Sequence, residues 1–388
     1  MKKVFKILGI SILSIVGVLL VGISVFLIVV AVNSPGRLEP LKDSAGNRIV
    51  GSLSEKNFVE IGGIQQGYFV RAENPENPVI LFLHGGPGSP SLPFQIPREL
   101  PVERLERYFT MVYWDQRGAG MSFCRSIDPA SMTVEQMVED TRQMTEHLRQ
   151  RFNQEKIFII GHSWGTYLGI RTIEKYPELF HAYIAIAQVV HSRESERLAF
   201  DFLLQHAKEI GDRRAVRDLL RFDRNAPDFP TLDYTMGVRT RLMNDFGVGI
   251  IRENFSLGDI VRDLLFFDGY TLREKINYLR GSLFTLNVMY SLYIDSNFLE
   301  TSTSFQVPVF ITHGVWDYQV SYTLAREWFE LIEAPDKAFF SFQYSAHSPN
   351  MEEPEKFVRI VREIAERILC SGCPKKNAND ANDANFYS

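Results

Sequence analysis

Ser163, Asp317 and His347 have the residue types, and the order along the chain, that acyl transfer requires. Ser163 is the centre of the Gly-x-Ser-x-Gly pattern at Gly161–Gly165. A serine hydroxyl attacks a carbonyl once a histidine takes its proton, and a carboxylate keeps that histidine in the required tautomer. Where this pattern marks a strand-to-helix turn, the acid and then the histidine follow later in the chain. We therefore predict Ser163 as nucleophile, Asp317 as acid and His347 as base.

Acyl transfer also needs N–H donors for the negative oxygen of its tetrahedral intermediate. One donor is expected from Trp164, the residue after the nucleophile, and the other from the loop after an early strand. The stretch "LFLHGGPGSP" supplies such a loop, and its consecutive glycines let the backbone approach a substrate. We predict Gly86 and Trp164 as the oxyanion donors.

The elements around these residues must hold them at one edge of a sheet. "IFII" before the serine and "TYLGIRTIEKY" after it have the composition of a buried strand and a helix. Asp317 and His347 each follow a short apolar run, "VPVFITHG" and "AFFSFQYS". The alternatives are an idle serine in a glycine-rich turn and, for Asp317, a turn residue or helix cap.

Six short apolar runs predict strands that are buried on both faces of a mainly parallel sheet. They are "PVILFLHG", "FTMVYWD", "KIFIIGHS", "AYIAIAQ", "VPVFITHG" and "AFFSFQYS". An amphipathic segment at residues 133–152, with Thr133 placed to cap it, predicts one of the intervening helices. "NFVEIGGIQQGYFVRAEN" predicts two further strands joined by a glycine turn. The fold class is therefore α/β, with helices on both faces of the sheet.

Residues 190–303 interrupt this alternation with amphipathic segments such as "ESERLAFDFLLQHAKEI" and "RRAVRDLLRF". We expect a helical cap over the strand ends, where ligands bind in such sheets. The core would then consist of residues 54–189 and 304–369. A separate helical domain without a functional role is the alternative.

The first 33 residues predict a membrane anchor. Ile7–Val32 is a run of 26 residues without a charge, long enough to cross a hydrocarbon layer about 30 Å thick. Lys2, Lys3 and Lys6 precede it, so we expect a cytoplasmic N-terminus and an extracytoplasmic catalytic domain, joined by a linker at residues 34–53. The alternative is a cleaved signal peptide, whose apolar region is usually shorter.

Composition excludes several other classes of function. A net charge of −5 and the lack of a lysine- and arginine-rich run argue against nucleic acid as a partner. Three cysteines, Cys124, Cys370 and Cys373, are too few for a disulfide framework, and no cluster suggests a metal or an organic cofactor. Residues 370–388 have almost nothing to bury, so we predict a disordered tail. The oligomeric state is left open.

Three motifs in register resemble the prolyl iminopeptidase family of α/β-hydrolase serine peptidases. They are "HGGPG" at His84–Gly88, "DQRGAGMS" at Asp115–Ser122 and "GHSWGTYLG" at Gly161–Gly169. The resemblance covers roughly residues 57–369 and implies an α/β-hydrolase fold with the triad and oxyanion donors predicted above. It also implies that Asp115 and Arg117 brace the site, as a buried charge pair or a carbonyl clamp.

The resemblance further implies an aminopeptidase that releases an N-terminal residue, of the proline type, from short peptides. Such enzymes read the free amino group with carboxylates of the cap, for which Glu194 and Glu196 are the nearest candidates. Both could instead be helix-surface charges that pair with Arg193 and Arg197. The chain also departs from the family, because it lacks the further glycines usual after "HGGPG" and has His162 where a glycine usually precedes the serine. A carboxylesterase or lipase-like hydrolase with the same triad, and a non-catalytic binding protein on the same fold, are the alternative functions.

Overall fold

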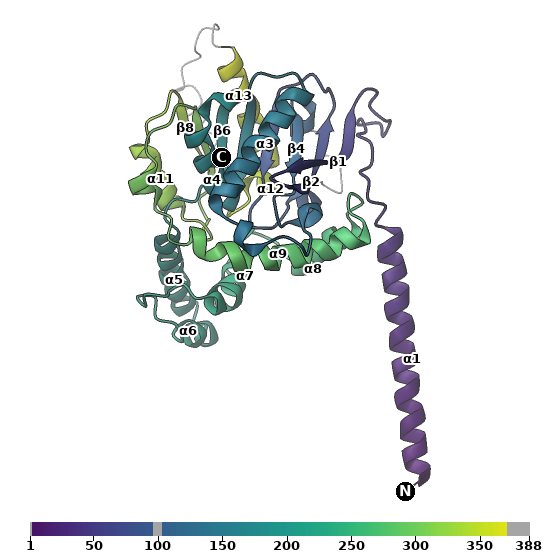
Figure 1. Ribbon diagram of the computed structural model, residues 1–388. Helices are drawn as coiled ribbons and strands as arrows, with labels where there is room; N and C mark the ends of the chain where they lie inside the picture. The colour runs from purple at the N-terminus through teal and green to yellow at the C-terminus, as the bar shows by residue number, and fades with distance from the viewer. Residues whose placement is uncertain (1, 96–102, 371–388) are drawn as a thin grey trace.

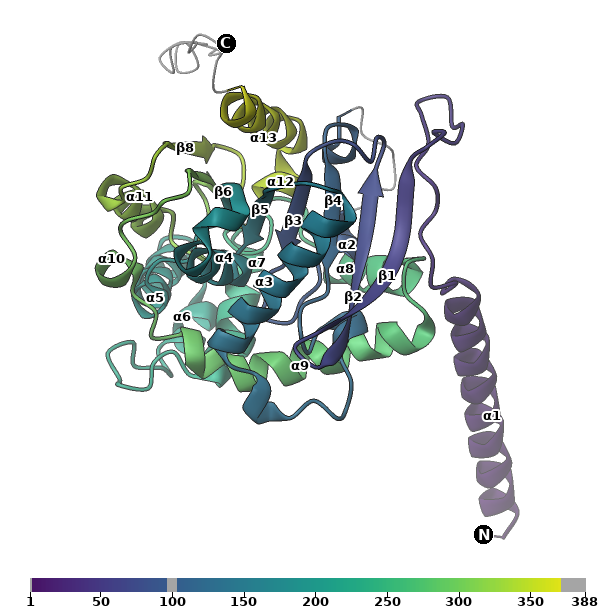
Figure 2. The ribbon, with the colours of Figure 1, turned by 45° about the horizontal axis from the view of Figure 1, so that its top comes forward.

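Eight strands form one sheet in the order β1-β2-β4-β3-β5-β6-β7-β8. The computed structural model describes residues 2–95 and 103–370, so the tail expected after Cys370, with Cys373, lies outside the described residues. The strands are β1 (Leu53–Ile61), β2 (Ile64–Ala72), β3 (Val79–Leu83), β4 (Thr110–Trp114), β5 (Ile157–His162), β6 (Phe180–Ile186), β7 (Val309–Gly314) and β8 (Lys337–Phe342). Figure 2 shows β1 and β2 at one edge of the sheet and β8 at the other.

The strand directions match the apolar patterns. The antiparallel hairpin β1–β2 turns at Gly62 and Gly63, which both have positive φ, and β2 is also antiparallel to β4. All other neighbours are parallel. Every residue of β3, β4 and β7 is buried, which explains why these strands read as continuous apolar runs. The predicted α/β-hydrolase sheet is thus confirmed.

Helices cover both faces of the sheet (Figure 1). The α-helices are α1 (Lys2–Val32), α2 (Leu92–Gln95), α3 (Val134–Arg151), α4 (Trp164–Lys175), α5 (Ser192–Glu209), α6 (Arg213–Leu219), α7 (Thr240–Asp245), α8 (Leu257–Phe266), α9 (Leu272–Tyr293), α10 (Phe298–Thr301), α11 (Tyr322–Leu331), α12 (Pro349–Glu352) and α13 (Pro354–Leu369). Helices α3, α4 and α11 pack on one face and α13 packs on the other. Thr133 caps α3 as predicted, since its side chain accepts a hydrogen bond from the Gln136 N–H.

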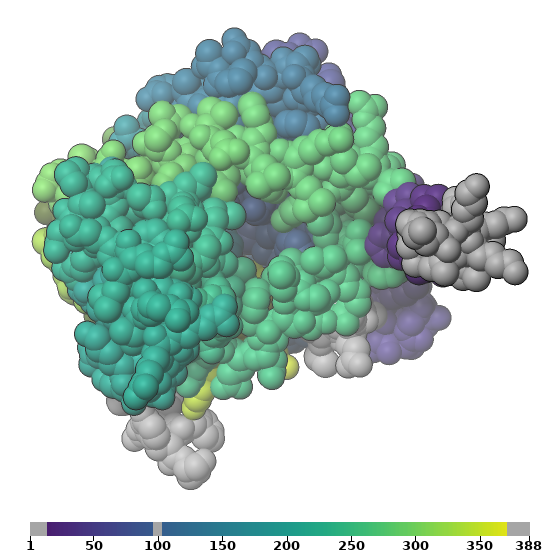
Figure 3. Space-filling model, turned by 90° about the horizontal axis from the view of Figure 1, so that it is seen from below, coloured from purple at the N-terminus to yellow at the C-terminus, as the bar shows by residue number. Residues whose placement is uncertain are grey.

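Helices α5 to α10 lie between β6 and β7 in the chain, and α5 to α9 form a layer below the sheet (Figure 1). This layer includes a π-helical segment, η5 (Tyr234–Arg239). From below, the layer is hollowed between its green segments, and the hollow is floored by atoms of the blue, earlier part of the chain (Figure 3). Helix α1 projects from this same side of the molecule.

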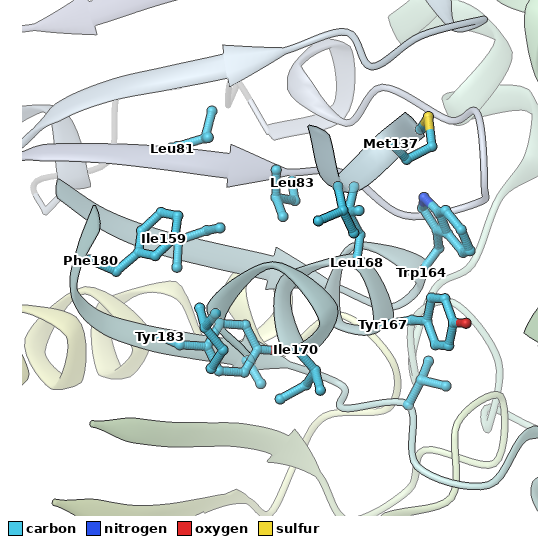
Figure 4. Close-up of a cluster of buried hydrophobic side chains, with 14 of the residues drawn as sticks. Leu81, Leu83, Met137, Ile159, Trp164, Tyr167, Leu168, Ile170, Phe180 and Tyr183 are labelled. Carbon is cyan, nitrogen blue, oxygen red and sulfur yellow. The ribbon is translucent and has the colours of Figure 1, made fainter. Parts of the chain in front are cut away.

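The largest core cluster lies between the sheet and helices α3 and α4 (Figure 4). Leu81 and Ile159 contribute from neighbouring parallel strands, and Leu168 and Ile170 contribute from α4. All four side chains are fully buried. The helix that follows the serine is therefore fixed to the sheet along its length.

One described helix, α1, is long and apolar enough to cross a membrane, over Ser14–Val32. It extends away from the body (Figures 1 and 2), and most of its described side chains are exposed. In the segment after it, Leu38 and Leu41 are buried.

Candidate active site

Ser163 occupies a strained turn between β5 and α4. Its φ of 55° and ψ of −120° lie in a region that non-glycine residues rarely adopt. The turn needs glycine on both sides, because a Cβ on Gly165 would lie 2.1 Å from the Leu83 carbonyl oxygen and one on Gly161 would lie 2.4 Å from the Gly165 carbonyl oxygen. The two glycines of the sequence pattern thus let α4 start directly against β3 and β5.

Asp317 and His347 meet at the ends of β7 and β8. The His347 Nδ1 lies 2.9 Å from the Asp317 Oδ2, and both side chains are buried. The backbone N–H groups of Gln319 and Val320 donate to the other carboxylate oxygen, each at 2.9 Å. This carboxylate fixes the orientation of the imidazole and leaves Nε2 as its other polar atom.

The electrostatics keep the acid ionised. Burial alone would raise the pKa of Asp317, but the attraction of His347 and hydrogen bonds from His313 and His347 outweigh burial. The net result is a pKa well below the usual range of an aspartate. Asp317 is therefore a carboxylate at neutral pH and can stabilise an imidazolium on His347.

His313 is a second histidine in contact with Asp317, and sequence reasoning did not assign it to the site. Its Nε2 lies 3.1 Å from the Asp317 Oδ2 and 3.1 Å from the Val320 carbonyl oxygen. His313 lies at the end of β7, four residues before Asp317. In the sequence, only this spacing could have suggested the contact.

The loop that carries His347 is held by Glu352. Its carboxylate accepts hydrogen bonds from the backbone N–H groups of Ala346 at 2.9 Å, Ser348 at 3.3 Å and Arg252 at 2.6 Å. The loop also packs closely on β7, since a Cβ on Gly314 would lie 2.0 Å from the Ala346 carbonyl oxygen. These contacts restrict the position of the imidazole.

The predicted oxyanion residues share a cavity with the serine. Gly86 has a φ of 116°, and it lines the cavity together with Ser163 and Trp164. The loop is supported from below, because the Gln116 side chain donates to the His84 carbonyl oxygen and accepts from the Trp164 indole, each at 3.1 Å. His84 itself stays neutral, since burial lowers its pKa to about 4.

The cavity has a volume of about 360 Å³ and is roofed by the cap. Its apolar lining includes Val190 from the loop after β6, Leu286 from α9 and Leu324 from α11. Its two charged residues are Glu196 and Arg239, which form a buried ion pair at 2.6 Å. Burial raises the pKa of Glu196, and the guanidinium offsets part of that shift.

The two cap carboxylates have different environments. Glu194 pairs with Arg197 at 3.4 Å on the half-exposed side of α5, as the surface-charge interpretation expects. Glu196 departs from that interpretation, because it is buried and its partner is Arg239 rather than a neighbour on its own helix. Arg193 pairs with Asp295 instead.

Asp115 and Arg117 are both buried, but they do not pair with each other. Arg117 pairs with Asp140 at 2.7 Å and donates to the Gly62 carbonyl oxygen, which ties α3 to the β1–β2 hairpin. Asp115 accepts from the Tyr270 hydroxyl at 2.7 Å and from the Met121 N–H at 2.8 Å. Burial raises its pKa to about 7. Of the two arrangements expected, Arg117 therefore makes a buried charge pair, with Asp140, and a contact with a carbonyl oxygen, whereas Asp115 makes separate contacts.

Within residues 2–95 and 103–370, no group of three or more histidine, cysteine, aspartate or glutamate side chains is arranged to hold a metal ion.

Comparison with known proteins identifies the family. Residues 102–354 match a family model described as serine aminopeptidase, S33. The chain belongs to this family. It is 32% identical over 325 residues to the probable aminopeptidase YbaC of Bacillus subtilis (strain 168). This match covers 82% of this chain and 98% of that protein.

Two more distant relatives are named proline iminopeptidase, the family that the motifs resemble. A proline iminopeptidase of Clostridioides difficile (strain 630) is 23% identical over 322 residues, covering 79% of this chain and 97% of that protein. The crystal structure of a Mycobacterium smegmatis proline iminopeptidase matches the fold with a TM-score of 0.58 at 16% identity, covering 82% of this chain and all of that chain. The predicted prolyl iminopeptidase-like α/β hydrolase is confirmed, and the chain is a peptidase-type hydrolase.

Proposed function

We propose that the chain is a membrane-anchored serine aminopeptidase that releases an N-terminal residue, of the proline type, from short peptides. The observation that carries this proposal is the strained Ser163 in the cavity wall, together with the Asp317–His347 pair in the same strand-end loops. The cavity volume of about 360 Å³ lies at the low end for ligand pockets, which supports a small substrate group next to Ser163.

In this proposal the reaction proceeds through an acyl-enzyme. His347 Nε2 takes the Ser163 proton as Oγ attacks the scissile carbonyl carbon, and the N–H groups of Gly86 and Trp164 bind the negative oxygen. The imidazolium, stabilised by Asp317, then gives its proton to the leaving amine. A water molecule, deprotonated by His347, attacks the ester and releases the free amino acid and Ser163.

Glu196 is the proposed acceptor for the substrate amine, because it is the acidic residue that lines the cavity within the described chain. Its ion pair with Arg239 leaves it only partly free for that role. The same pair favours the second candidate function, a carboxylesterase or lipase-like hydrolase, because an ester substrate needs no carboxylate to hold an amine.

Two assays on the purified full-length chain test these proposals. A fluorophosphonate probe should label the native chain and fail to label Ser163→Ala, whereas Ser126→Ala, which changes an exposed serine outside the cavity, should keep the label. Equal labelling of native chain and Ser163→Ala would remove the nucleophile assignment, and a native chain that takes no label would favour the non-catalytic binding protein.

The second assay determines the substrate class by measuring hydrolysis of a prolyl-naphthylamide and of short-chain p-nitrophenyl esters. The aminopeptidase proposal expects turnover of the amide. Glu196→Gln should then raise KM more for the free-amine substrate than for the esters. Hydrolysis of the esters alone would favour the esterase.

We further propose that α1 is retained as an anchor, with a cytoplasmic N-terminus and the catalytic domain outside. The length and hydropathy of Ser14–Val32 support the span, and the lysines before it support the orientation.

A further inference from the structure

Helix α1 is joined to the cap by several direct contacts rather than by a free tether. The Lys275 ammonium donates to the carbonyl oxygens of Asn33 at 2.8 Å and Leu265 at 2.5 Å. Pro35 forms a β-bridge with Thr271, directly before α9. The helix therefore leaves the body at a fixed place, between the end of α8 and the start of α9.

Next to this joint, α8 and α9 present an apolar cap face, defined here as Leu257, Val261, Ile276, Leu279 and Leu283. All five side chains are exposed, and Leu257, Leu279 and Leu283 are each about 60% exposed or more. The three from α9 follow at i, i+3 and i+7, so they form one stripe.

This stripe is directed away from the body. The opposite side of α9 packs on the loops that support the site, since a Cβ on Gly281 would lie 2.6 Å from the Gly118 carbonyl oxygen. Thr285 likewise donates to that carbonyl oxygen at 2.9 Å. The exposed stripe thus has no partner among the described residues, although contiguous apolar surface is unfavourable in water.

The apolar cap face continues into the catalytic cavity. Leu283 belongs to the face and also lines the cavity, and Leu286 and Tyr290 extend the same side of α9 inside it. Met236, which is about half exposed, lines the cavity from η5. The hollow seen from below in Figure 3 lies on the side from which α1 projects.

We propose that the apolar cap face rests on the lipid bilayer, so that the catalytic cavity opens toward the membrane surface and takes amphipathic substrates from it. The inference rests on the proposed anchor, because the joint at Lys275 sets this face at the level where the span ends. The bilayer that α1 enters provides an apolar layer for the leucines next to the joint.

The first test measures contact with lipid and needs no enzymatic activity. The full-length chain is placed in nanodiscs of neutral and anionic lipid, and flotation confirms that each variant is retained. Tryptophan is introduced as Leu279→Trp on the apolar cap face, and as Leu369→Trp at the far end of α13 as a matched exposed-leucine control. The added fluorescence of Leu279→Trp should be quenched by lipids with a spin label near the headgroup, and that of Leu369→Trp should not.

Three results overturn the inference. Equal quenching at the two positions in a chain that floats removes the docking and leaves the anchor and the hydrolase proposals intact. A blue-shifted Leu279→Trp emission without lipid quenching places protein, such as a second copy, on the face. A chain that does not float removes the anchor and the docking together.

The second test measures substrate delivery. Leu257→Glu combined with Leu279→Glu changes two residues that do not line the cavity, so kcat/KM for a water-soluble substrate should stay unchanged. For a long-chain substrate held in the bilayer, kcat/KM should fall about tenfold, because two leucines no longer enter the interface. An equal change for both substrates would overturn delivery from the membrane.

Discussion

Asp317 is the residue on which the geometry of the site converges. It accepts hydrogen bonds from two backbone N–H groups and lies within 3.1 Å of the imidazoles of His347 and His313. Only His347 follows from the Ser-acid-His order, so His313 supplies a second interaction to the same carboxylate oxygen.

Substitutions at these two positions should separate their roles. Asp317→Asn should lower kcat by roughly 10³–10⁴-fold, because the amide would no longer hold the required tautomer of His347. His313→Phe should lower kcat only by about tenfold, since one hydrogen bond to a buried charge is lost, and His313→Gln, which keeps a donor, should lose less. Steady-state kinetics on one substrate measures all three, and equal losses for His313→Phe and Asp317→Asn would contradict the separation.

His84 should make the fold sensitive to acid. Its pKa is lowered by burial from 6.5 to about 4 in the folded chain. Between pH 6.5 and pH 4, His84 is therefore protonated in the unfolded chain but neutral in the folded chain. The free energy of unfolding, which is at its full value above pH 6.5, falls as the pH is lowered toward 4. The loss approaches roughly 3 kcal/mol. Urea unfolding from pH 7 to pH 4 measures it, and His84→Gln should show a shallower decline.

At the level of elements, the turn between β5 and α4 depends on close packing. Gly165→Ala should destabilise the chain by about 1–3 kcal/mol or more and reduce fluorophosphonate labelling, because the new methyl group meets the Leu83 carbonyl oxygen at 2.1 Å. Gly237→Ala is the control, since its Cβ would meet nothing within 4 Å. Urea unfolding compares the two variants, and a Gly165→Ala chain as stable as Gly237→Ala would contradict the packing argument.

The strands, and the residues that follow them in the site, were predictable because they depend on local sequence patterns. The apolar runs predicted β3 to β8, and the residue types after β7 and β8 predicted which two side chains would meet. The ion pairs were not predictable. Arg117 binds Asp140 and Glu196 binds Arg239, across 23 and 43 residues of chain, and only the packing of α3 on the hairpin and of α5 on η5 brings these charges together. Nearest-neighbour spacing on one helix therefore predicted the partner of Glu194 and not that of Glu196.

For the whole molecule, the anchor makes a separate prediction. Leu19→Lys combined with Ile23→Lys should release the chain from the membrane fraction, because each charge at the centre of a span costs about 2.5–3.5 kcal/mol. Val50→Lys changes a side chain that is almost fully exposed on the body and should leave retention unchanged. Fractionation with N-terminal sequencing measures both, and a native chain found soluble with its first residue near Asn33 would contradict the anchor.

The ammonium of Lys275 that binds the Asn33 carbonyl oxygen has a consequence for the kinetics of an anchored enzyme. A domain on a free stalk samples the solution around it in three dimensions, whereas one fixed at its joint keeps a single side toward the plane in which it diffuses. Encounter with substrate then becomes a search in two dimensions. The rate would follow the number of substrate molecules per unit area of membrane, and adding inert lipid at constant total substrate would slow the enzyme where adding buffer would not.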